Sequence, residues 1–397
     1  MSKNKRFKVV VGISESPDSK VAAYLLHRQG YEVLGVTLFY SNKKSGGNGE
    51  TEDNNIYFKC DVKSSKSVKD FCLKLGIQHF GYFADEDFKN EVIDQCVAFR
   101  LKSASQNPCF GCSKLTLRLL YKKALDLEAD FISTGHFAKV HYSQTSKSYF
   151  VNSANDINSD QSFLIANSSQ EILAKLLLPL GDLRKVEVLK IAEKQGWYSE
   201  SIKDDKKCLT GDEYNKYLLA NVPKSLLKSG NVYVNDDELS IGFHEGVHLQ
   251  QFGKKLVGEI TSSQFNENVV IDVNFFNGAV YIEESKNVFT KKIFLNDVVL
   301  KKSAVKTKPK HVIIKIEKDP ISYKGVIYFK NNDSSLIILE KKISTIFPSG
   351  TYVTIYEPLQ GGKLSVLGAG RVNYELKFLD IMNGKKKNED KSTDFQF

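Results

Sequence analysis

Two cysteines in a C-x-x-C pair are the residues of this sequence most able to do chemistry. They lie in the segment Asn107-Pro108-Cys109-Phe110-Gly111-Cys112, which we expect to form a loop between two helices. A thiolate near a helix N-terminus is a usable nucleophile, and a cysteine pair is also half of a metal site. The sequence has no second C-x-x-C, so a zinc site of four cysteines is disfavoured. Cys109 and Cys112 could instead hold an iron–sulfur cluster together with Cys208.

A second candidate site is the polar segment Gly12–Lys20, which follows an apolar run and precedes a helical pattern. A turn between a strand and a helix presents backbone N–H groups and the positive end of the helix dipole, which is how many α/β proteins hold phosphate. Serine and aspartate also occur in such turns simply as helix N-caps, without any bound phosphate. Both interpretations remain open from the residues alone.

The third candidate is Ser133–Lys139, at the end of another predicted strand. Ligand sites of open α/β sheets gather beyond the carboxyl ends of the strands, so we expect Gly135 and His136 to meet whatever the first loop holds. For Cys60, Cys72 and Cys96, each beside apolar residues, we expect buried packing.

The elements that position these residues begin as strand, helix and strand at 7–11, 20–29 and 33–40. Polar residues at 41–55 predict a mobile loop. Alternation then continues with helices near 67–75, 86–101 and 113–128, strands at 78–83 and 130–133, and helices at 170–175 and 185–195, which we expect Gly181 and Gly196 to end. This pattern predicts a doubly wound α/β fold with a parallel sheet.

From about residue 231 the character of the sequence changes. Short runs rich in β-branched and aromatic residues predict an all-β region with a small barrel at its end. The predicted strands are 232–234, 269–275, 280–282, 311–316, 325–329, 335–339, 352–356 and 363–372. The polar residues 383–394 predict a frayed tail.

Composition and charge set the broad class. The chain has 397 residues, of which 41 % are hydrophobic and 26 % charged, so we expect a globular protein of two or three domains. The net charge is +9, and residues 281–397 contribute +8 of it (21 basic and 13 acidic residues), which suits a polyanionic partner or a solvated lysine-rich surface. No apolar run is long enough to span a membrane, and the N-terminus shows no signal-peptide pattern. We therefore expect a cytoplasmic protein without structural disulfides.

Taken in order, several segments resemble motifs of the tRNA-specific 2-thiouridylase family (MnmA/TrmU), over essentially the whole chain. They are Val9–Ser14 with Asp18-Ser19, Val21–Leu26, Asn107–Cys112, Ser133–His136, Asp160–Ser162, Pro179–Leu183, Cys208–Gly211, Gly242–Gly246, Phe252–Lys255, Pro348–Gly350 and Leu367–Gly370.

The resemblance implies a fold and a domain division. It implies a doubly wound parallel sheet of the PP-loop ATP-pyrophosphatase type (adenine nucleotide alpha hydrolase-like) at 1–212 and a central tRNA-contacting domain at 213–280. A C-terminal β-barrel at 281–382 and a flexible tail at 383–397 would follow.

The implied activity is ATP-dependent 2-thiolation of the wobble uridine (position 34) of tRNA, with Mg²⁺ at the phosphates. By resemblance Cys208 would carry a persulfide delivered by a sulfur-carrier protein, and Cys112 would be the nucleophile that releases the sulfur. The implied ATP contacts are Gly12, Ile13, Ser14, Glu15, Ser16, Pro17, Asp18, Ser19, Leu38 and Gly135. The implied contacts to tRNA and its target base are Asn107, Pro108, Cys109, His136, Ser159, Asp160, Gln161, Lys308 and Thr351. We expect no membrane partner and a monomer, and we assign no metal ligand.

The sequence also departs from the family pattern. Where the family loop has the form SGGxDS, this chain has Glu15 and Ser16 in place of the two glycines, followed by Pro17. A carboxylate there would repel polyphosphate unless it points outward or binds magnesium. The family's Arg-Tyr pair falls near Lys308, and its tRNA-contacting glutamine falls near Thr351. Besides the thiouridylase, two hypotheses therefore stay open: a related thiolase that acts on another RNA position or through an iron–sulfur cluster, and a non-catalytic RNA-binding paralogue.

Overall fold

The computed structural model describes residues 6–40, 65–101, 108–198, 224–234, 239–300, 308–316, 321–329, 334–347, 349–359 and 363–373. Several sequence predictions fall outside these residues, namely those for the loop at 41–55, for the tail at 383–394, and for Cys60, Asn107 and Cys208.

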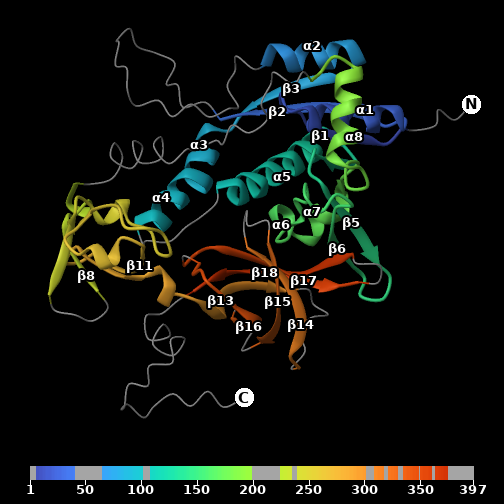
Figure 1. Cartoon of the computed structure of the whole chain (residues 1–397). Coiled ribbons are helices and arrows are strands. Elements are labelled where there is room, and N and C mark those ends of the chain that lie inside the picture. The colour runs from blue at the N-terminus through green and yellow to red at the C-terminus, as the bar shows by residue number, and fades with distance from the viewer. Residues whose placement is uncertain are drawn as a thin grey trace, which may run out of the picture.

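The N-terminal region is built on a five-stranded sheet in the order β3-β2-β1-β4-β7 (Figure 1). All of its strand pairs are parallel. Its strands are β1 (Lys8–Gly12), β2 (Glu32–Phe39), β3 (Gln78–Phe83), β4 (Phe131–Ser133) and β7 (Leu176–Leu177). Its helices are α1 (Pro17–Arg28), α2 (Ser65–Leu75), α3 (Asp85–Phe88), the π-helix η2 (Lys89–Ile93), α4 (Asp94–Leu101), α5 (Pro108–Asp126), α6 (Ser162–Ile165), α7 (Gln170–Lys175) and α8 (Lys185–Lys194).

Helices cover both faces of this sheet, and strand β1 shows why. Side chains of a strand alternate between faces, and Val10 packs with Leu120 of α5 on one face. Val9 and Val11 pack with apolar residues of α1 and α2 on the other. An apolar strand buried on both faces needs a helical layer on each side. The predicted doubly wound α/β fold is confirmed.

Helix α5 corrects one sequence prediction. Residues 108–112 are not a loop, because α5 begins at Pro108 and runs for 19 residues. Proline suits the first helical position, where its fixed φ fits the helix and its missing N–H would have no partner within the helix. Cys109 and Cys112 therefore lie in the first turns of a long helix, three residues apart.

The two glycines expected to end helices behave differently. Gly196 follows α8 with φ +73°, a left-handed conformation that glycine adopts easily. Gly181 ends no helix, because α7 has already stopped at Lys175. It is instead a close approach between segments: a Cβ at Gly181 would lie 2.1 Å from the carbonyl oxygen of Ala138. That prediction was wrong for Gly181.

A second, five-stranded sheet forms the centre of the chain, in the order β10-β9-β8-β12-β11. Its strands are β8 (Gly230–Val234), β9 (Ser240–His244), β10 (Glu259–Ile260), β11 (Asn268–Asn274) and β12 (Ala279–Glu284). Short 3₁₀ helices lie before, within and after it: η3 (Lys224–Leu226), η4 (Val247–Leu249), η5 (Ser263–Phe265) and η6 (Ser285–Asn287). Helix α4 of the N-terminal region lies against η4, and Figure 1 shows this sheet beside α4. The sheet runs through Glu284, slightly past the boundary proposed at residue 280.

The C-terminal strands close into a six-stranded antiparallel barrel. They are β13 (Thr290–Leu300), β14 (Lys310–Ile316), β15 (Ser322–Phe329), β16 (Ser335–Ile343), β17 (Tyr352–Pro358) and β18 (Leu364–Val372). Val312, Ile314 and Ile316 alternate into a buried core that the other barrel strands share. The predicted barrel is confirmed, although β13 was not among the predicted strands.

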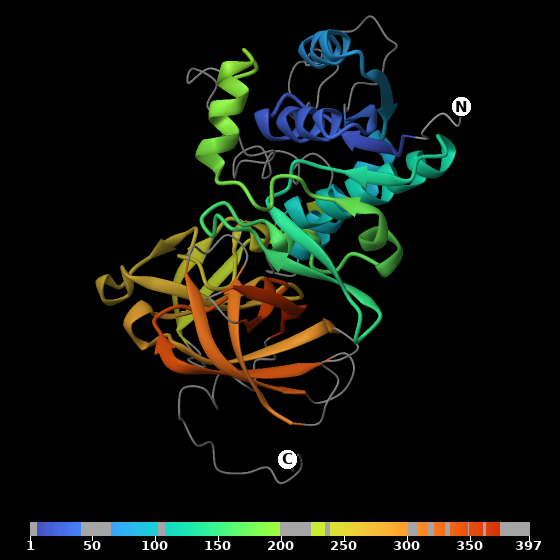
Figure 2. The same ribbon diagram turned by 90° about the vertical axis from the view of Figure 1, so that its right-hand side faces the viewer.

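A hairpin of the N-terminal region connects to this barrel. Strands β5 (Ala138–Ser143) and β6 (Ser148–Ser153) follow β4, and Asn152 of β6 pairs with Ser365 of β18. Figure 2 shows the hairpin reaching from the helical layers down to the barrel. None of the described helices combines the length and apolar character that a membrane crossing requires.

Candidate active site at the carboxyl ends of β1 and β4

The candidate site lies where strands β1 and β4 end side by side. Strand β2, the next in the chain, pairs with one edge of β1, while β4 pairs with its other edge. Such a reversal of strand order opens a crevice at the carboxyl ends of the strands, where open α/β sheets bind ligands. The segments that leave β1 and β4 are the predicted loop 12–19 and the predicted cluster 133–139.

Serine hydroxyls close the first loop on itself. The N–H of Ser14 donates to Oγ of Ser19 at 2.9 Å, and the N–H of Ser16 donates to Oγ of Ser14 at 3.3 Å. The N–H of Asp18 donates to Oγ of Ser16, also at 3.3 Å. Three backbone donors that a phosphate loop could offer are therefore bonded to the loop's own side chains. Ser16 is also the N-cap of α1, so the interpretation of this segment as a helix cap is correct for that residue.

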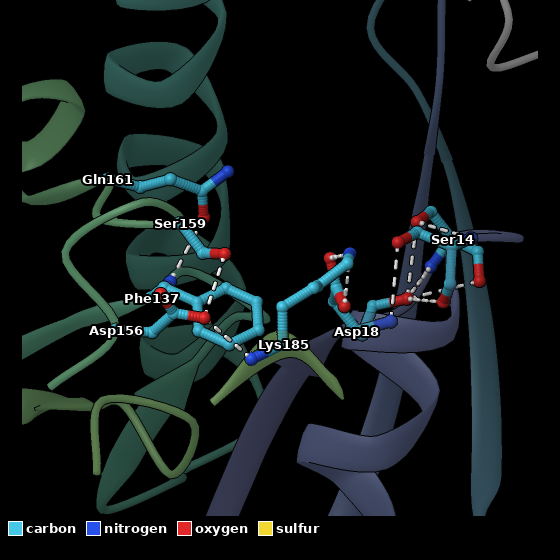
Figure 3. Close-up of polar contacts among 9 residues, drawn as sticks. Ser14, Asp18, Phe137, Asp156, Ser159, Gln161 and Lys185 are labelled. Atoms are coloured by element: carbon cyan, nitrogen blue, oxygen red, sulfur yellow. Dashed lines mark hydrogen bonds and ion pairs between the residues drawn. The ribbon is translucent and has the colours of Figure 1, made fainter. Parts of the chain in front are cut away.

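Two lysines bring positive charge to this loop. Lys185, the first residue of α8, places its ammonium 2.7 Å and 2.8 Å from the two carboxylate oxygens of Asp18 (Figure 3). Its backbone N–H donates to Asp156 at 2.9 Å, a bond that lowers the pKa of the Asp156 carboxyl. Lys20 is buried behind the loop and donates to Oγ of Ser67 at 3.0 Å. Burial lowers the pKa of Lys20, while the charge of exposed Glu15 acts in the opposite direction.

Gly135 packs directly against the start of α1. A Cβ at this position would lie 2.7 Å from the backbone nitrogen of Ser19 and 2.8 Å from the carbonyl carbon of Asp18. Both neighbours are backbone atoms, which cannot move aside as a flexible side chain can. Gly135 therefore lets the segment after β4 touch the loop after β1.

His136 connects this contact to the cysteine helix. Its Nε2 lies 3.1 Å from Oγ of Ser113, the residue that follows Cys112, and its Nδ1 lies 2.7 Å from Oγ1 of Thr134. Burial disfavours the charged imidazole and lowers the pKa of His136 to about 4. The ring is thus neutral near pH 7, held between two hydroxyl groups. The start of α5, the end of β4 and the start of α1 form one connected site.

The segment after β6 supports the site from a second side. The side-chain oxygen of Gln161 accepts a hydrogen bond from the backbone N–H of Phe137 at 3.0 Å (Figure 3). The backbone N–H of Gln161 donates to the carbonyl of Phe137 at 2.8 Å. Ser159 donates its hydroxyl to Asp156 at 3.1 Å. Both residues, which the family resemblance assigns to tRNA, therefore bond to the protein around the site.

Asp160 lies in the interior, with its side chain fully buried. One oxygen accepts from the N–H of Ala154 at 2.9 Å, and the other accepts from the hydroxyl of Ser162 at 3.0 Å. The second oxygen also lies 2.7 Å from the ammonium of Lys315 in the barrel. Ser162 lies 2.8 Å from the hydroxyl of buried Tyr356, another barrel residue. Asp160 thus bonds both to its own segment and to the barrel.

The other predicted residues have varied surroundings. Ile13, Pro17 and Leu38 are buried, whereas Lys308 is exposed. Thr351 is only 4 % exposed, and its hydroxyl has no hydrogen-bond partner within the described part of the chain. The proposed iron–sulfur set needs Cys208, which lies outside that part. Among the described residues, no group of three or more histidine, cysteine or acidic side chains is placed to hold a metal ion.

Sequence reasoning did not single out Lys185 or Asp156. For Lys185 a signal existed: a lysine at the first position of a helix faces the positive end of the helix dipole, so a partner elsewhere is expected. Asp156 carried no comparable signal, because an aspartate in a polar turn is ordinary.

Comparison with known proteins identifies the family. Residues 7–210 match the family model described as "tRNA methyl transferase HUP domain". A tRNA-specific 2-thiouridylase MnmA of Clostridium kluyveri is 30 % identical over 73 % of this chain and 80 % of that protein. The chain belongs to the tRNA-specific 2-thiouridylase family. The MnmA of Halothermothrix orenii is 29 % identical over 91 % of this chain and 98 % of its own length, so the relationship spans all three parts of the structure.

Among solved structures, a crystal structure of a 4-thiouridine synthetase–RNA complex with bound ATP aligns with 51 % of this chain and 44 % of that one. The sequence identity is 14 % and the TM-score 0.32, values too low for any conclusion about this chain.

Proposed function

We propose that this chain is a tRNA 2-thiouridylase that replaces the C2 oxygen of the wobble uridine with sulfur. One structural observation carries the proposal beyond family membership: the turn of α5 that holds Cys112 is bonded, through Ser113 and His136, to the strand ends that carry the candidate nucleotide loop. A nucleophile and a phosphate-binding loop at one edge of the sheet suit a reaction that activates an oxygen and then displaces it with sulfur.

The residues at the loop fit a nucleotide phosphate. The loop precedes a helix of 12 residues, whose N-terminus favours negative charge, and Lys185 brings an ammonium to the same point. Glu15 is exposed, so its carboxylate is not buried within the loop. We propose that the hydroxyls of Ser14 and Ser16 replace the donors that glycine backbones give elsewhere in the family, whereas the Ser19 hydroxyl donates to the carbonyls of Ser14 and Ser16. Asp18 would hold the accompanying Mg²⁺ by exchanging its ion pair with Lys185 for the metal. ATP supplies the adenylyl group that makes the C2 oxygen a leaving group.

The sulfur chemistry is assigned to the two cysteines of the family motifs. Cys208 would accept a persulfide from a sulfur-carrier protein. The thiolate of Cys112 would attack the inner sulfur of that persulfide, forming a Cys112–Cys208 disulfide and releasing hydrosulfide for attack at C2. A reductant must then restore both thiols. His136 is neutral in this site, so it takes part as a hydrogen-bonding group beside Ser113 rather than as a cation.

The lysines of the C-terminal region suit attraction of tRNA by its phosphates. The +8 surplus of residues 281–397 belongs to the part of the chain that includes the barrel strands. A wobble base must leave its stack to reach a catalytic pocket, so backbone contacts of this kind would supply part of the affinity. Exposed Lys308 is a candidate for such a contact. Thr351 would contact RNA only if its surroundings opened.

The direct test is thiolation of unmodified tRNA with ATP, Mg²⁺ and a persulfide donor, read by mass spectrometry of the digested tRNA. We expect 2-thiouridine at the wobble position with the natural chain, and none with Cys112→Ser or Cys208→Ser. Cys96→Ser, a change at a buried cysteine of α4, is the matched control and should retain activity. Wild-type protein that binds tRNA but never thiolates it would contradict the proposal.

A non-catalytic RNA-binding role is the second candidate, and the closed loop favours it. Because the N–H groups of Ser14, Ser16 and Asp18 already have partners, a nucleotide must compete with these bonds. Calorimetric titration with Mg·ATP separates the two functions. Magnesium-dependent binding supports the thiouridylase, whereas RNA binding without any affinity for ATP supports the second role.

A further inference from the structure

A ring stack joins the barrel to the start of the cysteine helix. Phe110, two residues before Cys112, stacks on Tyr352 of β17 with 4.2 Å between ring centroids and 27° between ring planes. Phe110 is 8 % exposed, and Phe163 of α6 contacts it edge-on at 5.6 Å. The ring of Phe110 is therefore enclosed between the barrel and α6.

Arg371 extends the stack to helix α4. On the barrel wall, Arg371 of β18 is the cross-strand partner of Tyr352. Its guanidinium lies 5.0 Å from the centre of the Tyr352 ring and 4.6 Å from that of Phe99 in α4. The barrel thus contacts both helix ends that flank residues 102–107.

Arg371 and Tyr352 are also held by hydrogen bonds to other segments of the chain. Arg371 donates to the carbonyl of Gly350 at 3.2 Å, and the Tyr352 hydroxyl accepts from the side-chain amide of Asn167, just after α6. Burial raises the pKa of Tyr352, so its hydroxyl stays protonated at neutral pH. Rings held in this way limit how far the first turn of α5 can shift toward the barrel and how far it can rotate about the helix axis.

We propose that Tyr352, supported by Arg371, is a positioning residue that sets the orientation of Cys112 through Phe110. The barrel then has a role in catalysis separate from binding RNA: it holds the reactive thiol at the strand ends, while Ser113 and His136 hold the next residue. This inference rests on the proposed function, since it assigns the thiol of Cys112 a catalytic step.

The central variant is Tyr352→Leu, which keeps an apolar side chain but removes the ring. We expect kcat for tRNA thiolation to fall at least tenfold while KM for tRNA stays within about twofold. Tyr352→Phe keeps the ring and loses only the hydroxyl, so it should restore kcat to within about threefold of wild type. Tyr323→Leu is the matched control, because Tyr323 packs within the barrel against Phe347 and should leave kcat unchanged.

A second readout does not depend on thiolation. The rate of Cys112 alkylation by iodoacetamide, measured by mass spectrometry of the Cys112 peptide, should change at least threefold in Tyr352→Leu and not in Tyr323→Leu. An alkylation rate identical to wild type overturns the positioning role, whether or not the wild-type chain thiolates tRNA. A rise in KM with unchanged kcat would also overturn it, because that result assigns Tyr352 to RNA binding. Absence of thiolation by the wild type, with an altered alkylation rate in Tyr352→Leu, rejects the proposed function and keeps the positioning of Cys112.

Discussion

The buried ion pair between Asp160 and Lys315 should couple the stability of the N-terminal region to that of the barrel. Asp160 is fully buried and Lys315 is 12 % exposed in the side chain, with 2.7 Å between the charged atoms. Lys315→Met keeps most of the aliphatic volume and removes the charge. The carboxylate would then keep its bonds from Ala154 and Ser162 but lose its counter-ion.

The expected loss is large for a single substitution. Removing one partner of a buried ion pair typically costs about 3–5 kcal/mol, because the remaining charge stays desolvated without compensation. The slight exposure of Lys315 lets water approach, so we expect about 3 kcal/mol, at the low end of that range. The double variant Asp160→Asn/Lys315→Met should be more stable than Lys315→Met, because it removes the uncompensated charge.

The chain offers a selective assay for this coupling. Its one tryptophan, Trp197, packs edge-on against Phe71 and Tyr24 in the N-terminal region, so its fluorescence reports that region alone. In urea titrations, Lys315→Met should lower the midpoint of the Trp197 transition, although the substitution lies in the barrel. Lys310→Met is the control on the same strand, because its ion pair with Glu357 is 3.9 Å long and more exposed and should contribute below about 1 kcal/mol. An unchanged Trp197 midpoint, or equal effects of the two variants, would refute the reasoning.

Three further predictions concern the site itself. Gly135→Ala would place a Cβ 2.7 Å from the backbone of Ser19, so we expect at least a tenfold loss of ATP affinity by calorimetry; unchanged affinity would argue against this contact. Lys185→Met should weaken ATP binding about tenfold, a change of about 1.4 kcal/mol in binding free energy. Lys190→Met, on the exposed side of α8, is the control and should leave ATP affinity unchanged. Equal losses of affinity in the two variants would exclude a specific role for Lys185. The pKa of His136 is lowered to about 4 in the folded chain, below its ordinary value of 6.5. Between these two values the unfolded chain binds a proton at His136 that the folded chain does not, so stability should decline as pH falls from about 6.5 toward 4. His136→Gln should reduce that decline in urea midpoints, and a decline identical to wild type would show that His136 does not titrate as described.

Local patterns were enough to predict much of the fold. Strand β14 alternates buried and less buried residues, and the apolar run of β1 needs cover on both faces, so both are visible in short windows of sequence. Strand β13 was missed because Lys291-Lys292 and Asn296-Asp297 interrupt its apolar residues. Its place is set by pairing with β18, more than 60 residues away, which no local pattern reveals.

The start of α5 shows the same limit at the site. The spacing of Cys109 and Cys112 was plain in the sequence, but whether they stood in a loop or a helix was not. Proline is compatible with both, and packing of Phe110 between α6 and the barrel helps hold the helical form.

By itself, the sequence determined which groups are available: two family cysteines, a serine-rich loop, Gly135 and His136, and a basic C-terminal region. It also indicated most of the strands and helices in their order, because hydrophobic periodicity is a local property of the chain. Only the tertiary structure decided their partners. Lys185 meets Asp18 across 167 residues, Lys315 meets Asp160 across 155, and Tyr352 stacks on Phe110 from another part of the fold. Such contacts depend on how sheets and helices pack in three dimensions, and packing joins residues irrespective of their distance along the chain.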